Sequence, residues 1–248
     1  AYIILKLKHI IRNIQKQFMT DIKQNLTVIH QKIEQSCAQF GRSCEDICLM
    51  AVSKTKPVSA IRAAYDAGQK DFGENYLQEA LEKINQLKDL PIVWHFIGSI
   101  QSNKTKTIAE NFDWVHTLSS SKHASRISAQ RPANLKPINA CIQVNISHEA
   151  SKSGIDTDSV QQLADEISTL DNIRLRGLMV IPAATTDEAQ QRQVFRQAAE
   201  LLDSLKNGGL VLDTLSMGMS ADYPAAIAEG ATIIRIGTAI FGKREKQP

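Results

Sequence analysis

The sequence is poor in the residues that build disulfide frameworks and metal sites. Its four cysteines, Cys37, Cys44, Cys48 and Cys141, form no C-x-x-C pair, and its six histidines lack ligand spacing. We therefore expect no bound metal. We expect the thiols to be buried and reduced, as in a cytoplasmic protein.

A strong charge and long apolar runs are also absent. The 29 basic and 26 acidic residues leave a net charge of +3, which is too small and too dispersed to indicate nucleic acid or a membrane as a partner. No segment has the about 20 consecutive apolar residues of a transmembrane helix. What remains is an ordinary globular composition, 43% hydrophobic and 22% charged, in a chain long enough for one large domain.

The first twenty residues have a pattern of their own. Apolar residues recur at helical spacing from Ile3 to Phe18, interleaved with lysine and arginine, and no acid precedes Asp21. A targeting segment or a membrane-surface helix has this pattern. Met19 is also a natural start residue, and we favour an upstream extension without a role. We assign residues 1–20 to an N-terminal extension and residues 21–248 to one domain.

From Asp21 onward, short apolar segments alternate with amphipathic ones without a linker. The pattern predicts eight strands, at residues 47–53, 71–73, 92–97, 114–118, 139–146, 175–181, 212–216 and 232–236. It predicts helices at residues 22–40, 57–68, 77–87, 101–111, 121–130, 160–170, 186–206 and 224–229.

This alternation indicates parallel β/α units, and eight is the number of strands that closes a barrel. Seven residues follow Phe241, so we expect no helix after the last strand. The helix before the first strand can cover the gap between strands one and eight. We predict an α/β fold, a single (β/α)8 TIM-type barrel with an N-terminal helix. An open doubly wound sheet is the alternative, although the loop from Ser53 to Pro57 lacks the glycines of a dinucleotide site.

Lys54 lies at the C-terminal tip of the first predicted strand, at the end where such barrels bind ligands. A lysine amine must be neutral to form a Schiff base, and burial near a cation such as Arg235 favours the neutral form. The alternative is an ordinary exposed lysine. Lys56 is the competing candidate, but it abuts Pro57 and is expected to point to solvent.

The other predicted strand ends are rich in amide, hydroxyl and glycine groups. They are Asn75, residues 95–98, Ser119, Asn145, Met179, residues 216–220 and residues 235–238.

Two of these ends have the composition of a phosphate site. Gly218 and Ser220 lead into a short helix, and Arg235 to Thr238, with Gly237 between them, end the last strand. Barrels commonly bind phosphate after strands seven and eight, where glycine allows close approach and hydroxyl groups donate. The alternative is ordinary loop and cap residues. A phosphate site beside a Schiff-base lysine suggests pyridoxal 5′-phosphate (PLP) as the cofactor.

Seven motifs follow one another in order within a match that runs from about Met19 to Arg244, nearly the whole chain. They are AVSKTKP (51–57), FGENYLQE (72–79), WHFIGSIQSNK (94–104), NI (145–146) with SKSG (151–154), RGLM (176–179), LSMGMS (215–220) and RIGTAIFG (235–242). Together they resemble the PLP homeostasis protein family, which is similar to the N-terminal barrel domain of alanine racemase.

The resemblance implies a barrel that binds PLP covalently through Lys54. It implies phosphate contacts from Ser220, Gly237 and Thr238, with Arg235 near the pyridine nitrogen. Asn75 lies in a matching motif and is counted among the cofactor-binding residues. Lys152 matches a family lysine that could hold PLP or pass it on; a solvated loop charge is the alternative.

The residues also argue against an enzyme. Arg235 cannot give up its proton, so a pyridine nitrogen beside it stays unprotonated and the ring is a weak electron sink. Racemisation needs an acid–base group on each face of the substrate. In alanine racemase a tyrosine of a C-terminal domain supplies the second group, and we expect no such domain here. Tyr76 and Tyr223 are expected to pack at helix starts, so we predict no catalytic residue.

The predicted function is to bind PLP as a Schiff base on Lys54 and to act in intracellular PLP homeostasis, as a carrier or buffer. We expect a cytoplasmic monomer, because no long apolar stripe remains once the helices cover the barrel, and apo PLP-dependent enzymes as further partners. A PLP-dependent amino-acid racemase is the alternative. A sugar-phosphate aldolase or isomerase that uses Lys54 without a cofactor is a second one.

Overall fold

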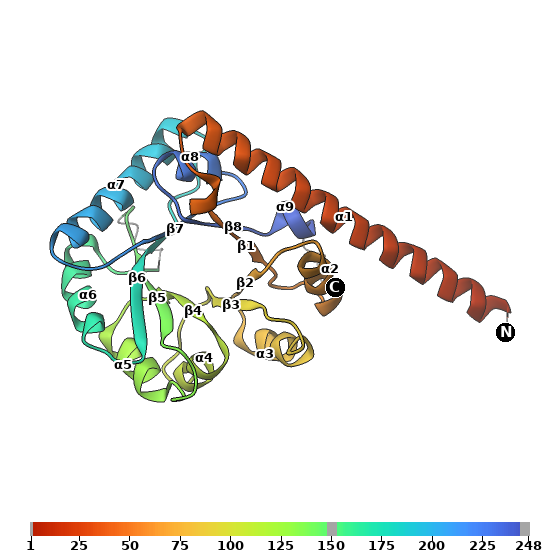
Figure 1. The fold of residues 1–248 in the computed structure, drawn as a ribbon, viewed down its shortest axis with the longest axis horizontal. Coiled ribbons are helices and arrows are strands. Elements are labelled where there is room, and N and C mark those ends of the chain that lie inside the picture. Colours follow the sequence, from red (N-terminus) through yellow and green to blue (C-terminus); the bar gives the residue numbers. More distant parts are fainter. Residues whose placement is uncertain (1, 148–152, 244–248) are drawn as a thin grey trace.

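Eight parallel strands close into a barrel, in which each strand pairs with the next and β8 pairs with β1 (Figure 1). The computed structural model describes residues 2–147 and 153–243, with side chains from residue 21 onward. The strands are β1 (Cys48–Val52), β2 (Asp71–Glu74), β3 (Val93–Phe96), β4 (Trp114–Leu118), β5 (Ile138–Val144), β6 (Ile173–Val180), β7 (Thr214–Met219) and β8 (Ile233–Ile236). This closure confirms the predicted barrel and rules out the open doubly wound sheet.

Helices surround the barrel at the positions that the sequence predicts, within a few residues. They are α1 (Tyr2–Phe40), α2 (Val58–Asp66), α3 (Leu77–Gln86), α4 (Thr105–Asn111), α5 (Ser121–Gln130), α6 (Val160–Ser168), α7 (Glu188–Asn207), α8 (Tyr223–Ala228) and α9 (Thr238–Phe241), with 3-10 turns at Cys44–Asp46 and Thr157–Ser159. The exceptions are α1, which begins at Tyr2 and not at residue 22, and α9, which was not predicted. Among the other helices the start of α4 differs most, because residues 101–104 form a turn in which the Lys104 N–H donates to the Gln101 carbonyl oxygen.

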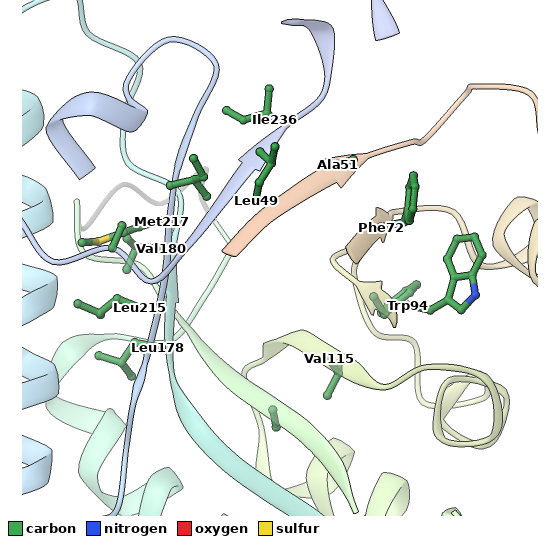
Figure 2. Close-up of a cluster of buried hydrophobic side chains, with 14 of the residues drawn as sticks. Leu49, Ala51, Phe72, Trp94, Val115, Leu178, Val180, Leu215, Met217 and Ile236 are labelled. Carbon is green, nitrogen blue, oxygen red and sulfur yellow. The ribbon is translucent and has the colours of Figure 1, made fainter. Parts of the chain in front are cut away.

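The side chains of each strand alternate between the helices and the barrel interior. Outward-facing side chains from seven strands belong to one buried hydrophobic cluster between barrel and helices (Figure 2); they are Leu49, Ala51, Phe72, Trp94, Val115, Leu178, Val180, Leu215, Met217 and Ile236. The residues between them, among them Met50, Gly73 and Arg235, therefore face inward. A Cβ on Gly73 would lie 2.6 Å from the Met50 sulfur, so a larger residue there would require the Met50 side chain to shift.

Helix α1 is continuous over 39 residues and extends past the barrel at its N-terminal end (Figure 1). Its second half packs against α2, α8 and α9. The buried side chains follow one stripe, Ile22, Leu26, Ile29, Ile33 and Cys37. The predicted helix thus covers the seam between β1 and β8, because the only helix after β8 in the described chain is the single turn α9. The expectation of no helix after β8 is wrong to that extent.

Cysteine burial agrees with the prediction only in part. Cys37 and Cys141 are buried, but Cys44 and Cys48 are only half-buried, since they lie before and at the N-terminal end of β1. All four are free thiols. In the part of the chain whose side chains are described, no three His, Cys, Asp or Glu side chains cluster as metal ligands would.

None of the helices described is both long and apolar enough to cross a membrane.

Candidate functional site

Four neighbouring strands bring the predicted site residues to one arc of the barrel mouth. Lys54 follows β1, Asn75 follows β2, Ser220 follows β7, and Gly237 with Thr238 follows β8. Because all strands are parallel and run β7–β8–β1–β2 around the barrel, these residues share its C-terminal rim. Gly237 lies directly against β1, since a Cβ there would be 3.2 Å from the Val52 carbonyl oxygen.

The backbone on each side of Lys54 is fixed. Ser53 donates its N–H to the Gly73 carbonyl oxygen at 3.0 Å and accepts a bond from the Lys83 amine on its own carbonyl oxygen at 2.8 Å. Thr55 donates its N–H to the Glu79 carboxylate at 2.6 Å and has a left-handed φ of 63°. A non-glycine residue in this region costs of order 1 kcal/mol and persists when its surroundings enforce it. Lys54 is half-buried.

The groups that hold this loop form a buried ionic cluster between β2 and α3. The Lys83 amine contacts Glu74 at 2.7 Å and Glu79 at 2.5 Å, and the Ser53 hydroxyl donates to Glu74 at 2.6 Å. Glu74 is fully buried, and desolvation raises its pKa despite the opposing effect of Lys83. Such a buried pair adds little net stability, but breaking it is costly. Its effect here is to hold the residues on both sides of Lys54.

Lys56 does not point to solvent, and the sequence-based expectation for it is wrong. Its amine donates to the carbonyl oxygens of Phe241, Gly242 and Lys243 at 2.9, 3.1 and 3.0 Å. These carbonyls end α9, where a cation is favourable. Lys56 therefore ties the β1–α2 loop to the segment that begins at Thr238.

The turn after β7 is built for a close approach of the backbone. Gly218 has φ 90°, and a Cβ there would lie 2.6 Å from the Ala226 Cβ and 3.0 Å from the Tyr223 Cα. The Met219 N–H donates to the Asp222 carboxylate at 2.6 Å. Burial raises the pKa of Asp222, although the hydrogen bond from Met219 acts in the opposite direction. Ser220 is exposed at the top of this turn.

Gly237 and Thr238 begin α9 beside this turn. Gly237 is the N-terminal cap, and the cap makes no side-chain hydrogen bond. The first N–H groups of a helix have no partner inside it, so a ligand or water can accept from them. Thr238 is exposed and its hydroxyl adds a further donor.

Asn75 has a buried acceptor without a partner among the described residues. Its Oδ1 accepts no hydrogen bond there, while its Nδ2 makes a long bond of 3.5 Å to the Ile97 carbonyl oxygen. An unsatisfied buried acceptor is costly, so a donor from a ligand would be favourable at this place.

Arg235 lies deeper in the barrel than Lys54. It is 4% exposed and pairs with Met50, four residues before Lys54 on the neighbouring strand. Its guanidinium donates to the Ser216 hydroxyl at 3.0 Å and to the Val180 carbonyl oxygen at 2.9 Å. Burial lowers the pKa of Arg235 to about 10, which leaves it a cation at neutral pH.

Several contacts of the site were not predicted from the sequence. Glu79 and Lys83 lie in the predicted helix 77–87 and Glu74 follows the predicted strand 71–73, but the sequence predicts no contact among them. Residues 95–98 are predicted at a strand end. His95 instead lies within β3, 1% exposed, and bonds to His116 inside the barrel. The contact between the two histidines could have been predicted, because the alternation of side chains along two successive strands places one histidine of each in the barrel interior. Lys152 lies outside the described residues.

The two tyrosines considered as acid–base groups differ. Tyr223 is 7% exposed at the start of α8, as predicted. Tyr76 is 51% exposed at the N-cap of α3, so its assignment as a packing residue is wrong.

A pocket of about 450 Å³ opens at the other end of the barrel, at the N-terminal ends of the strands. Its lining includes Asp71, His95, Trp114, Arg176 and Asp213, and none of the predicted site residues. Ligand sites of such barrels lie at the C-terminal ends of the strands, so the arc around Lys54 remains the candidate site despite this pocket.

Comparisons with known proteins agree with this fold along nearly the whole chain. Residues 25–245 match the family model of the alanine racemase N-terminal domain. The pyridoxal phosphate homeostasis protein of Pseudomonas aeruginosa is 53% identical over 227 residues, which cover 92% of this chain and 97% of that protein. The protein of the same name from Escherichia coli is 50% identical over 230 residues, with coverages of 92% and 98%.

Solved structures add two further similarities. PipY of Synechococcus elongatus, solved with PLP bound, is 36% identical with a TM-score of 0.78, and the match covers 89% of this chain and 100% of that one. Alanine racemase of Clostridium difficile has a TM-score of 0.71 at 14% identity, and the match covers 56% of its chain, which shows the shared barrel fold alone. With half of its residues identical to curated homologues over most of its length, the chain belongs to the pyridoxal phosphate homeostasis protein family.

Proposed function

We propose that this chain binds PLP as a Schiff base on Lys54 and acts in intracellular PLP homeostasis, as a carrier or buffer. The single observation behind this proposal is the arc itself, in which a lysine with a constrained backbone shares the C-terminal rim with two turns suited to phosphate. The PLP-bound relative has the same fold at 36% identity, and the curated relatives are named for PLP homeostasis and not as racemases.

The residues of the arc fit the cofactor. PLP supplies an aldehyde that condenses with an amine, and Lys54 would provide that amine. Ser220, Gly237 and Thr238 would bind the phosphate through hydroxyl and backbone N–H donors. The unpartnered Asn75 Oδ1 would accept a bond from a cofactor group.

Arg235 would face the pyridine nitrogen. Its pKa of about 10 keeps it protonated and a donor at neutral pH, so the nitrogen beside it stays unprotonated. A ring in that state withdraws electrons weakly, which disfavours transamination and decarboxylation. Racemisation, the alternative activity, would still need a second acid–base group on the opposite face of the substrate, and the sequence predicts none. No observation favours the sugar-phosphate aldolase or isomerase.

The direct test is a borohydride reduction of the PLP-loaded protein followed by peptide mapping. We expect the adduct on Lys54, and we expect Lys54→Ala to lose the visible absorption band while Lys70→Ala, a lysine at the opposite end of β2, keeps it. An adduct confined to Lys56 or Lys152 would overturn the assignment. Exchange of the alanine α-hydrogen for deuterium far faster than with free PLP would favour the racemase.

The cellular setting belongs to the same proposal. We expect a cytoplasmic monomer whose residues 21–248 form the PLP-binding domain and whose residues 1–20 are an extension. Apo PLP-dependent enzymes are the expected recipients. Mixing loaded protein with an apo-enzyme should decrease the visible band as the enzyme gains activity, and a band that stays constant would contradict transfer.

A further inference from the structure

A row of hydrogen-bonded polar side chains crosses the interior of the barrel behind the proposed site. Asp71 Oδ1 lies 3.0 Å from His95 Nε2, and His95 Nδ1 lies 2.9 Å from His116 Nε2. His116 Nδ1 lies 3.0 Å from Ser216 Oγ, which accepts from Arg235 Nη1 at 3.0 Å. The five residues come from β2, β3, β4, β7 and β8.

The row is almost completely removed from solvent. His116 and Ser216 are 0% exposed, His95 is 1% exposed and Arg235 is 4% exposed. Asp71 is the exception, with 27% of its side chain exposed, and it lines the pocket at the N-terminal end of the barrel. The row thus connects that pocket to the guanidinium below Lys54.

The chemistry of the groups leaves one arrangement of protons for a neutral row. A carboxylate only accepts, so neutral His95 donates from Nε2 to Asp71 and its Nδ1 accepts from His116. Ser216 accepts from Arg235, which only donates, and its hydrogen is left for His116 Nδ1. His116 is neutral, because burial first, and then His95 and Arg235, hold its pKa well below the usual value. Its proton is therefore on Nε2 and is donated to His95 Nδ1.

Every bond in the row is consequently oriented from Arg235 toward Asp71. The guanidinium has five N–H donors, and Ser216 and Val180 accept two of them. Other titratable groups face the two ends, Cys48 beside Asp71, and Asp222 and Cys141 near Arg235. Because the interior is desolvated, an oriented row of this kind is stronger than the same bonds in water.

We propose that Ser216, His116, His95 and Asp71 are positioning residues. They would hold the Arg235 guanidinium in the orientation in which it faces the bound ring, and the Asp71 carboxylate would influence the charge around that ring. This inference rests on the proposed PLP site. Its new element is that a carboxylate at the opposite mouth of the barrel influences the cofactor, although no described residue of that mouth belongs to the arc around Lys54.

The proton order can be tested without cofactor. In protein labelled with 15N in the imidazole rings, at pH 7.5, both His95 and His116 should show an unprotonated Nδ1 and a protonated Nε2. Assignment by the variants His95→Gln and His116→Gln identifies each signal. A proton on Nδ1 of His116 would reverse the row and overturn the inference, whatever PLP does.

The influence on the cofactor is tested in the loaded protein. Ser216→Ala removes the link to Arg235, and we expect about tenfold weaker PLP binding, the effect of losing one hydrogen bond to a charged group. Asp71→Asn keeps the size of the side chain but removes its charge. We expect it to lower the midpoint pH of the visible band by a few tenths of a unit, because the cationic form loses a distant anion.

His123→Gln is the matched control. His123 also bonds to a serine, Ser102, at 3.1 Å, but it lies on α5 outside the barrel, and its replacement should leave affinity and band midpoint unchanged. If Ser216→Ala and Asp71→Asn both bind PLP with the affinity and the midpoint of the parent, the positioning role is wrong. If the parent itself binds no PLP, the proposed function fails, and the 15N measurement still decides the proton order.

Discussion

Lys54 is positioned through its two neighbours. Ser53 and Thr55 are bonded on opposite sides by Lys83 and Glu79, and the left-handed conformation of Thr55 turns the chain immediately after the lysine. A lysine side chain loses considerable rotamer freedom when it is held by a ligand. Because the backbone of Lys54 is already fixed, its backbone entropy would not have to be lost again on binding.

The buried histidine of the interior makes stability depend on pH. The pKa of His116 is lowered in the folded protein and ordinary, near 6.5, in the unfolded chain. Below pH 6.5 the unfolded state therefore binds one more proton, and the free energy of unfolding should fall by about 1.4 kcal/mol per pH unit from this group. Above pH 6.5 the contribution is complete.

Urea unfolding at pH 7.5 and pH 5.5 checks this slope. In His116→Gln the slope of the free energy of unfolding against pH should be smaller by about 1.4 kcal/mol per pH unit, in addition to any loss of stability that does not depend on pH. An unchanged slope in the variant would mean that His116 is protonated in the folded state.

The cysteines should differ in reactivity. Burial foremost, and then Asp71, raise the pKa of Cys48 to about 12, and burial with the neighbouring Cys44 raises that of Cys37 to about 12. Burial also raises the pKa of Cys141. Thiolates are the reactive form, so at pH 8 a disulfide reagent should label Cys44 first and the other three only on unfolding. Cys44→Ser should abolish the fast phase; a fast phase that persists would contradict this order.

Two elements, the β1–α2 loop and α3, depend on each other. Lys83 on α3 joins Glu74 on β2 to the Ser53 carbonyl oxygen, and Glu79 on α3 joins the Thr55 N–H. Lys56 extends the same loop to α9 on the other side. The loop that presents Lys54 is therefore attached to both flanking β/α units.

Removing the buried cation of this cluster should be costly. Lys83→Met leaves Glu74 buried without its partner, and we expect a loss of about 3–5 kcal/mol at pH 7. Desolvation already raises the pKa of Glu74 and the loss of Lys83 raises it further, so the destabilisation should grow as pH rises above the ordinary carboxyl range and shrink below it.

Lys106→Met is the control for this prediction. Lys106 pairs with Glu110 at 3.8 Å with 69% of its side chain exposed, so its loss should change stability little. Equal losses of stability in the two variants would contradict the prediction that burial makes the loss of Lys83 more costly than that of an exposed lysine. PLP binding should weaken in Lys83→Met alone.

The molecule as a whole uses its two mouths differently. The C-terminal mouth presents the arc from Ser220 to Asn75, and the N-terminal mouth opens into a pocket of about 450 Å³. The barrel interior between them is filled by Met50, Cys141 and the polar row that ends on Arg235, so it is a packed core rather than a channel.

Helix α1 serves the whole barrel as a cover of its seam. The stripe from Ile22 to Cys37 is buried, and Asn25 donates to the Ile240 carbonyl oxygen on α9 at 2.9 Å. Deletion of residues 1–20 retains this stripe, and the free energy of unfolding should change by less than about 1 kcal/mol. Deletion of residues 1–33 removes most of it and should unfold the barrel. A large loss in the shorter deletion, measured by urea unfolding, would place residues 1–20 within the domain.

Local patterns were sufficient for the order of the elements, the eight strands and the place of Lys54. Apolar periodicity and strand length are properties of neighbouring residues, and the C-terminal end of a strand is known once the strand is. The glycines at 218 and 237 were likewise found from their turns, and the motifs around them led to the family.

Contacts between distant residues depended on the closed barrel. Lys56 reaches carbonyls 185 residues away in the sequence, and His116 bonds to Ser216 across 100 residues. Such pairs follow from strand register and from which side of each strand faces inward, and a shift of one residue would send every side chain to the other face. The sequence alone therefore determined which lysine and which turns lie at the C-terminal mouth of the barrel. Only the tertiary structure decided which side chains hold the Lys54 loop and which polar side chains fill the barrel interior behind it.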